Sequence, residues 1–157
     1  TQQVHNLCIK ALDSIVNNDE YLTMLRIPTV FWPLLRKSWT RKDPHLYGRF
    51  DFGLSPDINT PPKLFEYNAD TPTALLESSD IQERWMNDVI GENGKQFNEI
   101  KQNLVSRWQE IKPVLLKRLG GWFRWNAKVY FSGVPDPEDM ATLNVLRSTP
   151  ETAGTYR

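Results

Sequence analysis

The sequence predicts an α/β protein in which helices pack against a small sheet. Three observations support this fold class. An opening segment has apolar residues at helical spacing, two later stretches alternate polar and apolar residues, and further segments with helical spacing follow them. A period of two indicates a strand, and a period of 3.6 indicates a helix. With 157 residues the chain is long enough for one domain with a sizeable core, so we treat residues 1–157 as one domain.

The first predicted elements are a helix and a hairpin. The helix covers residues 1–16 and places on one face Val4, Leu7, Cys8, Ala11, Leu12, Ile15 and Val16. The pattern is less regular over residues 17–46, where three prolines interrupt it. Residues 47–54 (YGRFDFGL) and 63–69 (KLFEYNA) are typical of strands, and the turn-rich segment SPDINTPP joins them. Two adjacent strands with a short connection predict an antiparallel hairpin.

The second half predicts helices and one more strand. Thr71 and Pro72 are a good start for a helix that runs to about Val89, with a buried side formed by Leu75, Ile81, Trp85 and Val89. A longer helix, which Pro113 kinks or ends, carries Phe97, Ile100, Leu104, Trp108 and Ile111. Residues 128–134 (KVYFSGV) predict a strand, and a further helix is expected over residues 136–147. Together with the hairpin, this strand leads us to expect a mixed sheet flanked by helices.

Composition favours no special class of partner or compartment beyond an ordinary globular protein. Nineteen basic residues balance nineteen acidic ones, so no net charge favours nucleic acid or an anionic membrane. Cys8 is the single cysteine, which excludes an intrachain disulfide and fits a reducing, cytoplasmic location. No apolar stretch approaches the roughly 20 residues that span a bilayer. The chain begins at Thr1 and stops at GTYR without a closing element, so we expect it to be a fragment.

The two hairpin strands bring polar side chains to one face. Side chains at positions i and i+2 of a strand share a face. Arg49 and Asp51 therefore point the same way on the first strand, as do Glu66 and Asn68 on the second. The opposite faces carry Phe50, Phe52, Phe65, Tyr67 and Ala69. Burial of these groups in the core predicts that all four polar groups emerge on one side of the hairpin.

This polar face has the composition of a magnesium site. Asp51, Glu66 and the amide oxygen of Asn68 are hard oxygen donors, which suit Mg²⁺. Arg49 beside them suits a carboxylate or a phosphate. The competing interpretation is a solvated sheet face with cross-strand ion pairs. Asparagine is unfavourable in strands, and the following ADTPT places a helix start around Thr71, which is an anion-binding feature. Both observations favour a site.

Other candidates are weaker. His5 and His45 are assigned structural roles, because neither lies near a nucleophile in the sequence pattern. Trp122 and Trp125, in GGWFRWN, are less easily assigned to packing than Trp108. The sequence contains no phosphate loop, dinucleotide-binding glycine motif, nucleophile elbow or zinc spacing.

Three segments carry a resemblance to a known family. YGRFDF, KLFEYNADTPTALLE and FSGVPDPEDMATLNVL, in this order and spacing, resemble the amino-terminal part of the glutathionylspermidine synthase family, its pre-ATP-grasp domain. The resemblance covers most of the chain, and EYNADTPT is its most specific part. It implies an incomplete ATP-grasp ligase. Such ligases join a carboxylate to an amine through an acyl phosphate and use ATP and magnesium.

The resemblance also implies roles for individual residues. Arg49 would be catalytic, contacting the acid substrate or its acyl phosphate. Magnesium, the cofactor, would be held by Asp51, Glu66 and Asn68.

Further substrate contacts are implied outside these strands. Thr71 would bind the peptide substrate, and Glu138 and Asp139 would form the acidic pair for the thiol-peptide substrate. This pair is conservative rather than identical, since the founding enzyme has two glutamates. Most of the ATP pocket would lie beyond Arg157.

The expected partners are a small-molecule acid and amine, of the glutathione and polyamine kind, and neither nucleic acid nor a membrane. Two other functions stay open. One is a non-catalytic module that binds metal and acid without an ATP pocket. The other is a hydrolase with Asp51 and Glu66 as an acid–base pair. The hydrolase ranks last, because Arg49 and Asn68 serve it poorly.

Overall fold

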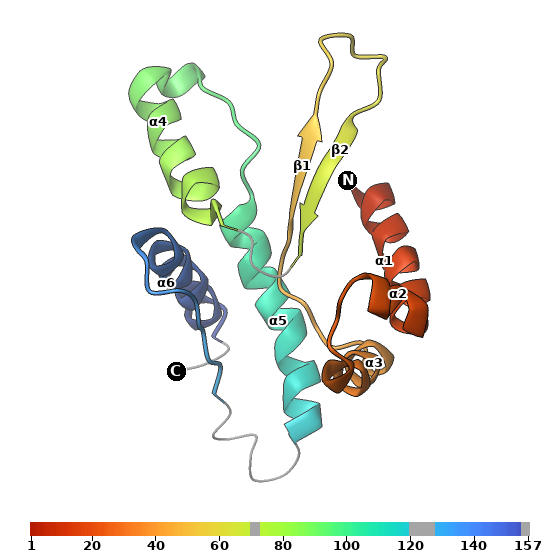
Figure 1. Cartoon of the computed structure of the whole chain (residues 1–157). Helices are drawn as coiled ribbons and strands as arrows, with labels where there is room; N and C mark the ends of the chain where they lie inside the picture. The colour runs from red at the N-terminus through yellow and green to blue at the C-terminus, as the bar shows by residue number, and fades with distance from the viewer. Residues whose placement is uncertain (70–72, 120–127, 155–157) are drawn as a thin grey trace. The chain divides into compact units, whose positions relative to one another are not determined.

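The chain forms two compact units in a computed structural model, residues 1–45 and residues 46–157 (Figure 1). The structure describes residues 1–69, 73–119 and 128–154. The first unit is helical, and the second combines an antiparallel hairpin with helices. The α/β class predicted from the sequence is confirmed at this level.

The first unit contains three α-helices and one short 3₁₀ turn. Helix α1 spans Gln2–Val16, α2 spans Asp19–Met24, and α3 spans Trp32–Arg41 after the turn η1, Thr29–Phe31. The helix predicted for the opening segment is confirmed. Its last residue, Val16, is buried, as is Leu22 of α2. These two side chains form the small core of the unit.

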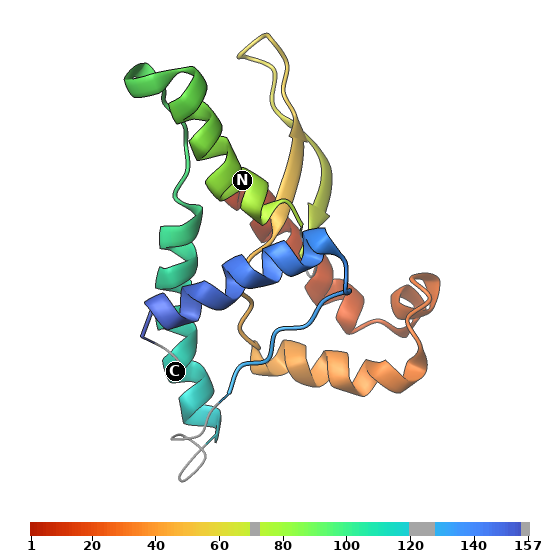
Figure 2. The ribbon, with the colours of Figure 1, turned by 90° about the vertical axis from the view of Figure 1, so that its left-hand side faces the viewer.

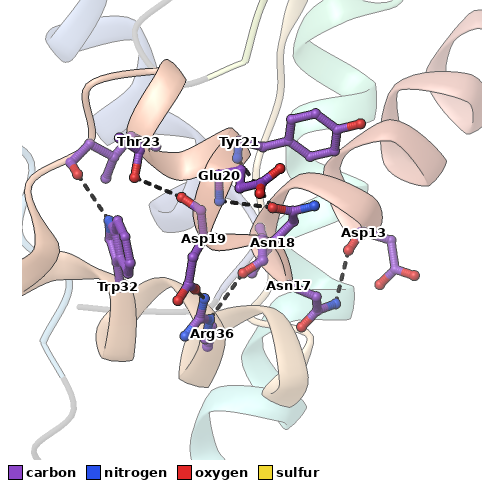
Figure 3. A network of polar contacts seen from close by, with 11 residues as sticks. Asp13, Asn17, Asn18, Asp19, Glu20, Tyr21, Thr23, Trp32 and Arg36 are labelled. Carbon is purple, nitrogen blue, oxygen red and sulfur yellow. Dashed lines mark hydrogen bonds and ion pairs between the residues drawn. The ribbon is translucent and has the colours of Figure 1, made fainter.

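A polar network joins the three helices of the first unit (Figure 3). Asn18 caps α2, because its Oδ1 accepts the backbone N–H groups of Glu20 at 2.8 Å and Tyr21 at 3.3 Å. Arg36 of α3 donates through Nε to the carbonyl of Val16 at 3.1 Å and forms an ion pair with Asp19. A carbonyl at the end of a helix has no partner within that helix, so Arg36 satisfies a group that α1 leaves open.

The second unit begins with the predicted hairpin. Strand β1, Arg49–Gly53, pairs antiparallel with β2, Lys63–Asn68. Helical structure follows as the π-helical segment η2, Glu77–Ile81, then α4, Gln82–Val89, and the turn η3, Gly91–Asn93. Helix α5 spans Ile100–Leu119, and α6 spans Pro137–Thr152. Helix α6 crosses α5 and packs on it (Figure 2). Among the described residues, no helix is both long enough and apolar enough to cross a bilayer.

The core of the second unit lies where α5 meets α6. Trp108 of α5 is buried, and its Nε1 donates to Thr149 Oγ1 of α6 at 2.9 Å. Its ring and that of Phe131 pack edge to face, with the ring centroids 6.1 Å apart. Leu104 and Ile111, one turn to either side, are also buried. The predicted buried face of this helix is confirmed at these three positions.

Two predictions about the second half are wrong. Residues 128–134 do not form a strand. A strand needs a neighbour for its hydrogen bonds, and in the part of the chain that the structure describes the one sheet consists of β1 and β2. The expected mixed sheet is therefore absent there. Of the two outcomes predicted for Pro113, an end of the helix is excluded, because α5 continues to Leu119, and a kink stays a prediction. The predicted helix over residues 136–147 is confirmed and extends to Thr152.

The helix predicted from Thr71 differs from the expectation. Thr71 and Pro72 lie outside the described residues. Ala74 has φ of +64°, which is not helical, and helical structure runs from Leu75. Leu75 is buried as predicted, but Trp85 is 56% exposed. The other predicted core residues that are exposed are Ile81, Val89 and Phe97. The period of a sequence shows which face of a helix is apolar, but not whether another element covers it.

The two helical tryptophans give a test of this core. We expect Trp108→Ala to lower the free energy of unfolding by about 3–5 kcal/mol, because it removes a buried ring and leaves a cavity. Trp85→Ala, the matched control on α4, should lower it by less than about 1 kcal/mol. Urea denaturation followed by circular dichroism measures both values. Equal losses for the two variants would show that the assignment of the core is wrong.

Candidate cation and acid site on the hairpin

The strand register places the predicted polar groups together. Arg49 lies opposite Asn68, and Asp51 lies opposite Glu66. Residues directly opposite each other in an antiparallel pair project on the same side. The four side chains therefore share one face of the hairpin, as the alternation in the sequence predicts.

Arg49 is at the centre of this face. Its Nε donates to Asp51 Oδ1 at 2.9 Å, and its Nη2 donates to Asp51 Oδ2 at 3.2 Å. The same Nη2 lies 3.3 Å from Glu66 Oε1 on the other strand. The guanidinium thus makes a two-pronged contact with one carboxylate and a cross-strand contact with the second. We call Arg49, Asp51, Glu66 and Asn68 the hairpin cluster.

Asn68 completes the cluster. Its Nδ2 donates to Glu66 Oε1 at 2.7 Å. The Asn68 amide oxygen takes no part in this bond. The donor set, two carboxylates and an amide oxygen, fits the ligands that Mg²⁺ prefers. Among the described residues, no group of three or more His, Cys, Asp or Glu side chains could hold a metal ion. A cation at the hairpin cluster would therefore complete its shell with water or phosphate oxygens, as Mg²⁺ commonly does.

The charged groups of the cluster shift one another's pKa values. The hydrogen bond from Arg49 holds the pKa of the Asp51 carboxyl below its usual value, and the same bond raises the pKa of the Arg49 guanidinium. Both groups are therefore charged at neutral pH. Their side chains are 34% and 37% exposed, and that of Glu66 is 53% exposed, so solutes can reach the cluster from solvent.

The opposite face of the hairpin differs from the prediction. Phe50 stacks on Tyr67, with ring centroids 3.9 Å apart, but Phe50 and Phe52 are only half-buried. Phe65 is the extra residue of a β-bulge and is 74% exposed. Its ring covers Gly53, where an added Cβ would lie 2.6 Å from Phe65 Cζ. The prediction that these aromatic residues join the core of the chain is therefore wrong: the bulge takes Phe65 out of the alternation, and no described helix packs extensively on the hairpin to bury the other rings.

Two backbone features beside the cluster were not predicted. The ring of Tyr67 lies against Gly48, where an added Cβ would be 2.7 Å from Tyr67 Cε2. A glycine at the start of a strand marks such close approaches, and this signal is present in the sequence. Arg49 Nη1 also lies 3.4 Å from the carbonyl oxygen of Thr73, just before the left-handed residue Ala74. We know of no sequence signal that predicts the conformation of Ala74.

The structure describes two of the remaining candidate residues, Glu138 and Asp139. Thr71, Trp122 and Trp125 are outside the described residues. Glu138 and Asp139 are in the first turn of α6, where Asp136 Oδ1 accepts their backbone N–H groups at 2.9 Å and 3.3 Å. Asp139 Oδ2 accepts the N–H of Val134 at 3.0 Å. Asp139 thus stabilises the start of the helix, and its substrate contact stays a prediction, as does that of Glu138.

The lowered pKa of Asp51 gives a pH-dependent prediction. The Arg49–Asp51 interaction stabilises the fold in full above the ordinary carboxyl pKa, and this contribution is lost as the pH falls through the lowered pKa. In ¹³C NMR titrations we expect Arg49→Ala to raise the pKa of the Asp51 carboxyl. Asp57 is the internal control, because its pKa is lowered chiefly by the backbone N–H of Asn59. An unchanged pKa of Asp51 in this variant would contradict the contact.

Comparison with known proteins identifies the family. The family model described as glutathionylspermidine synthase pre-ATP-grasp matches residues 1–157. A putative acid–amine ligase of Haemophilus influenzae is 39% identical over 117 residues, which are 71% of this chain and 28% of that protein. Trypanothione synthetase of Crithidia fasciculata is 34% identical over 68% of this chain and 17% of its own length. Bifunctional glutathionylspermidine synthetase/amidase of Escherichia coli is 35% identical over 71% of this chain and 18% of its own length.

The matches therefore span less than a third of each of these relatives. The family model, in contrast, matches this chain over its whole length, and this match establishes the family. The resemblance inferred from the hairpin and the DPED segment is confirmed: this chain belongs to the glutathionylspermidine synthase family, in its pre-ATP-grasp region.

Proposed function

We propose that this chain supplies the cation- and acid-binding residues of an ATP- and Mg²⁺-dependent carboxylate–amine ligase. The observation that supports this most is the hairpin cluster, in which a guanidinium lies between two carboxylates on one solvent-accessible face. Family membership adds the reaction class, because three relatives are named as a ligase or as synthetases.

The proposed reaction has two steps. An oxygen of the acid carboxylate attacks the γ-phosphorus of ATP, and the bond from that phosphorus to the β–γ bridging oxygen breaks, which gives an acyl phosphate and ADP. The amine nitrogen then attacks the acyl carbon, the bond to the phosphate oxygen breaks, and the nitrogen loses a proton. The products are an amide, inorganic phosphate and ADP. Both steps concentrate negative charge on phosphoryl and acyl oxygens, so positioned positive charge accelerates them.

The residues of the cluster fit these demands. Arg49 would bind the acid carboxylate and stabilise the acyl phosphate, since its planar guanidinium matches both groups. Asp51, Glu66 and Asn68 would hold the magnesium. A metal bound there would neutralise part of the negative charge on the phosphates.

The substrate class follows from the names of the relatives, and it is part of the proposal. An acid of the glutathione kind and an amine of the polyamine kind agree with the names trypanothione synthetase and glutathionylspermidine synthetase. Thr71, Glu138 and Asp139 are the proposed further contacts with the peptide substrate. We also propose that residues 1–157 act as one pre-ATP-grasp domain of a cytoplasmic ligase whose nucleotide-binding half lies outside this chain.

A non-catalytic module is the second candidate. A cluster that bound acid and cation would not by itself provide a phosphoryl donor. Such a module would bind Mg²⁺ or a glutathione-like acid in calorimetry without hydrolysing ATP.

Substitution of Arg49 tests the ligase proposal. ADP release that requires acid, amine and Mg²⁺ is measured for this chain and for any longer product of its reading frame. We expect Arg49→Ala to lower kcat/KM by about 10²–10³-fold, because it removes a positive charge from the transition state. Arg84→Ala removes an equal charge from an exposed position of α4 and should leave the rate unchanged.

The outcomes separate the candidates. An Arg49→Ala enzyme as active as the unaltered protein would exclude the proposed role of Arg49. Binding of acid and Mg²⁺ without ATP turnover in any form of the protein would favour the non-catalytic module.

A further inference from the structure

Arg49 and the proposed magnesium ion require the same carboxylate oxygens. Both oxygens of Asp51 accept hydrogen bonds from the Arg49 guanidinium, at 2.9 Å and 3.2 Å. Glu66 Oε1 accepts from both Arg49 and Asn68. A divalent cation that coordinates Asp51 directly therefore competes with these bonds for the same oxygens, and its charge repels the guanidinium at close range.

The contacts of Arg49 are of a kind that exchanges readily. The pair it makes with Asp51 is about a third exposed on both sides, and such ion pairs contribute little to stability. Apart from the Nε bond, its contacts with Asp51, Glu66 and the Thr73 carbonyl are 3.2–3.4 Å long. Little free energy therefore opposes the release of the guanidinium.

We propose that Arg49 is an exchangeable internal counter-ion of the hairpin cluster, and that a divalent cation displaces it and frees the guanidinium to bind the acid substrate. This inference rests on the proposed function, because it takes the cluster to be a cation site. It adds an order of events: the cation binds first, and a carboxylate or phosphate group then binds to the released Arg49. It also adds a coupling, since ligands that exchange at shared groups change each other's affinity reciprocally.

Mn²⁺ binding to the 157-residue chain tests the exchange. Free Mn²⁺ is measured by electron paramagnetic resonance, with Mg²⁺ as competitor, for the unaltered chain and for three variants. We expect Arg49→Met to bind Mn²⁺ about 5-fold or more tightly than the unaltered chain, because no internal cation competes. Arg49→Lys should fall between them, since a lysine cannot contact both oxygens of Asp51 in the same way.

Lys63→Met is the matched control for charge. Lys63 is an exposed residue of β2, opposite Gly53, and its removal subtracts the same charge from the same hairpin. A general field effect would raise the affinity for Mn²⁺ as much in Lys63→Met as in Arg49→Met. Exchange at the cluster predicts a much smaller change for Lys63→Met.

A second measurement needs no variant. In ¹⁵N NMR spectra of the unaltered chain, we expect Mg²⁺ to shift the Nε–H resonance of Arg49 and to speed its exchange with water. Backbone resonances of the helices should keep their positions. The NMR result stands even where a substitution at Arg49 disturbs folding.

Each result decides between the two proposals. Mn²⁺ binding that is equal or weaker in Arg49→Met, together with an unmoved Nε–H resonance, would overturn the exchange and leave the cation site standing. No Mn²⁺ binding by the unaltered chain or by Arg49→Met would overturn the cation site and the exchange together.

Discussion

The register of the hairpin is the constraint on which the site depends. With Asp51 opposite Glu66 and Arg49 opposite Asn68, two carboxylates, an amide and a guanidinium share one face. A slip by one residue would send the side chains of one strand to the other face and disperse the cluster. The stacking of Phe50 on Tyr67 and the fit of the Tyr67 ring over Gly48 both favour the observed pairing. The aromatic face thus supports the polar one without being part of a deep core.

The hairpin and its polar face could be predicted because they depend on a local period. Alternation fixes which side chains share a face, whatever the rest of the chain does. The bulge at Phe65 has no such signature, since the segment KLFEYN reads as an uninterrupted strand. Burial was harder to predict, because it depends on which other element covers an apolar face. Trp108 and Trp85 both occupy apolar helical positions, but only Trp108 has α6 packed beside it.

The exposure of the cluster suits a site whose ligands arrive from solvent. Half-exposed carboxylates hold a cation weakly by themselves, and substrate phosphates would add to its coordination. Helix α6 makes a different use of its acids, because Asp136 and Asp139 bond to backbone N–H groups at its start. The hairpin carboxylates are thus joined to a guanidinium, whereas Asp136 and Asp139 bond to the backbone around the start of α6.

The most direct test of the central claim is the location of a paramagnetic cation on the folded chain. Mn²⁺ broadens the amide resonances of nearby residues, and a titration followed by ¹H–¹⁵N NMR shows which are affected first. The proposed site predicts that Asp51, Glu66 and Asn68 lose intensity before any others. Broadening centred on Asp136–Asp139 or on Asp57, with the hairpin cluster unaffected, would contradict it.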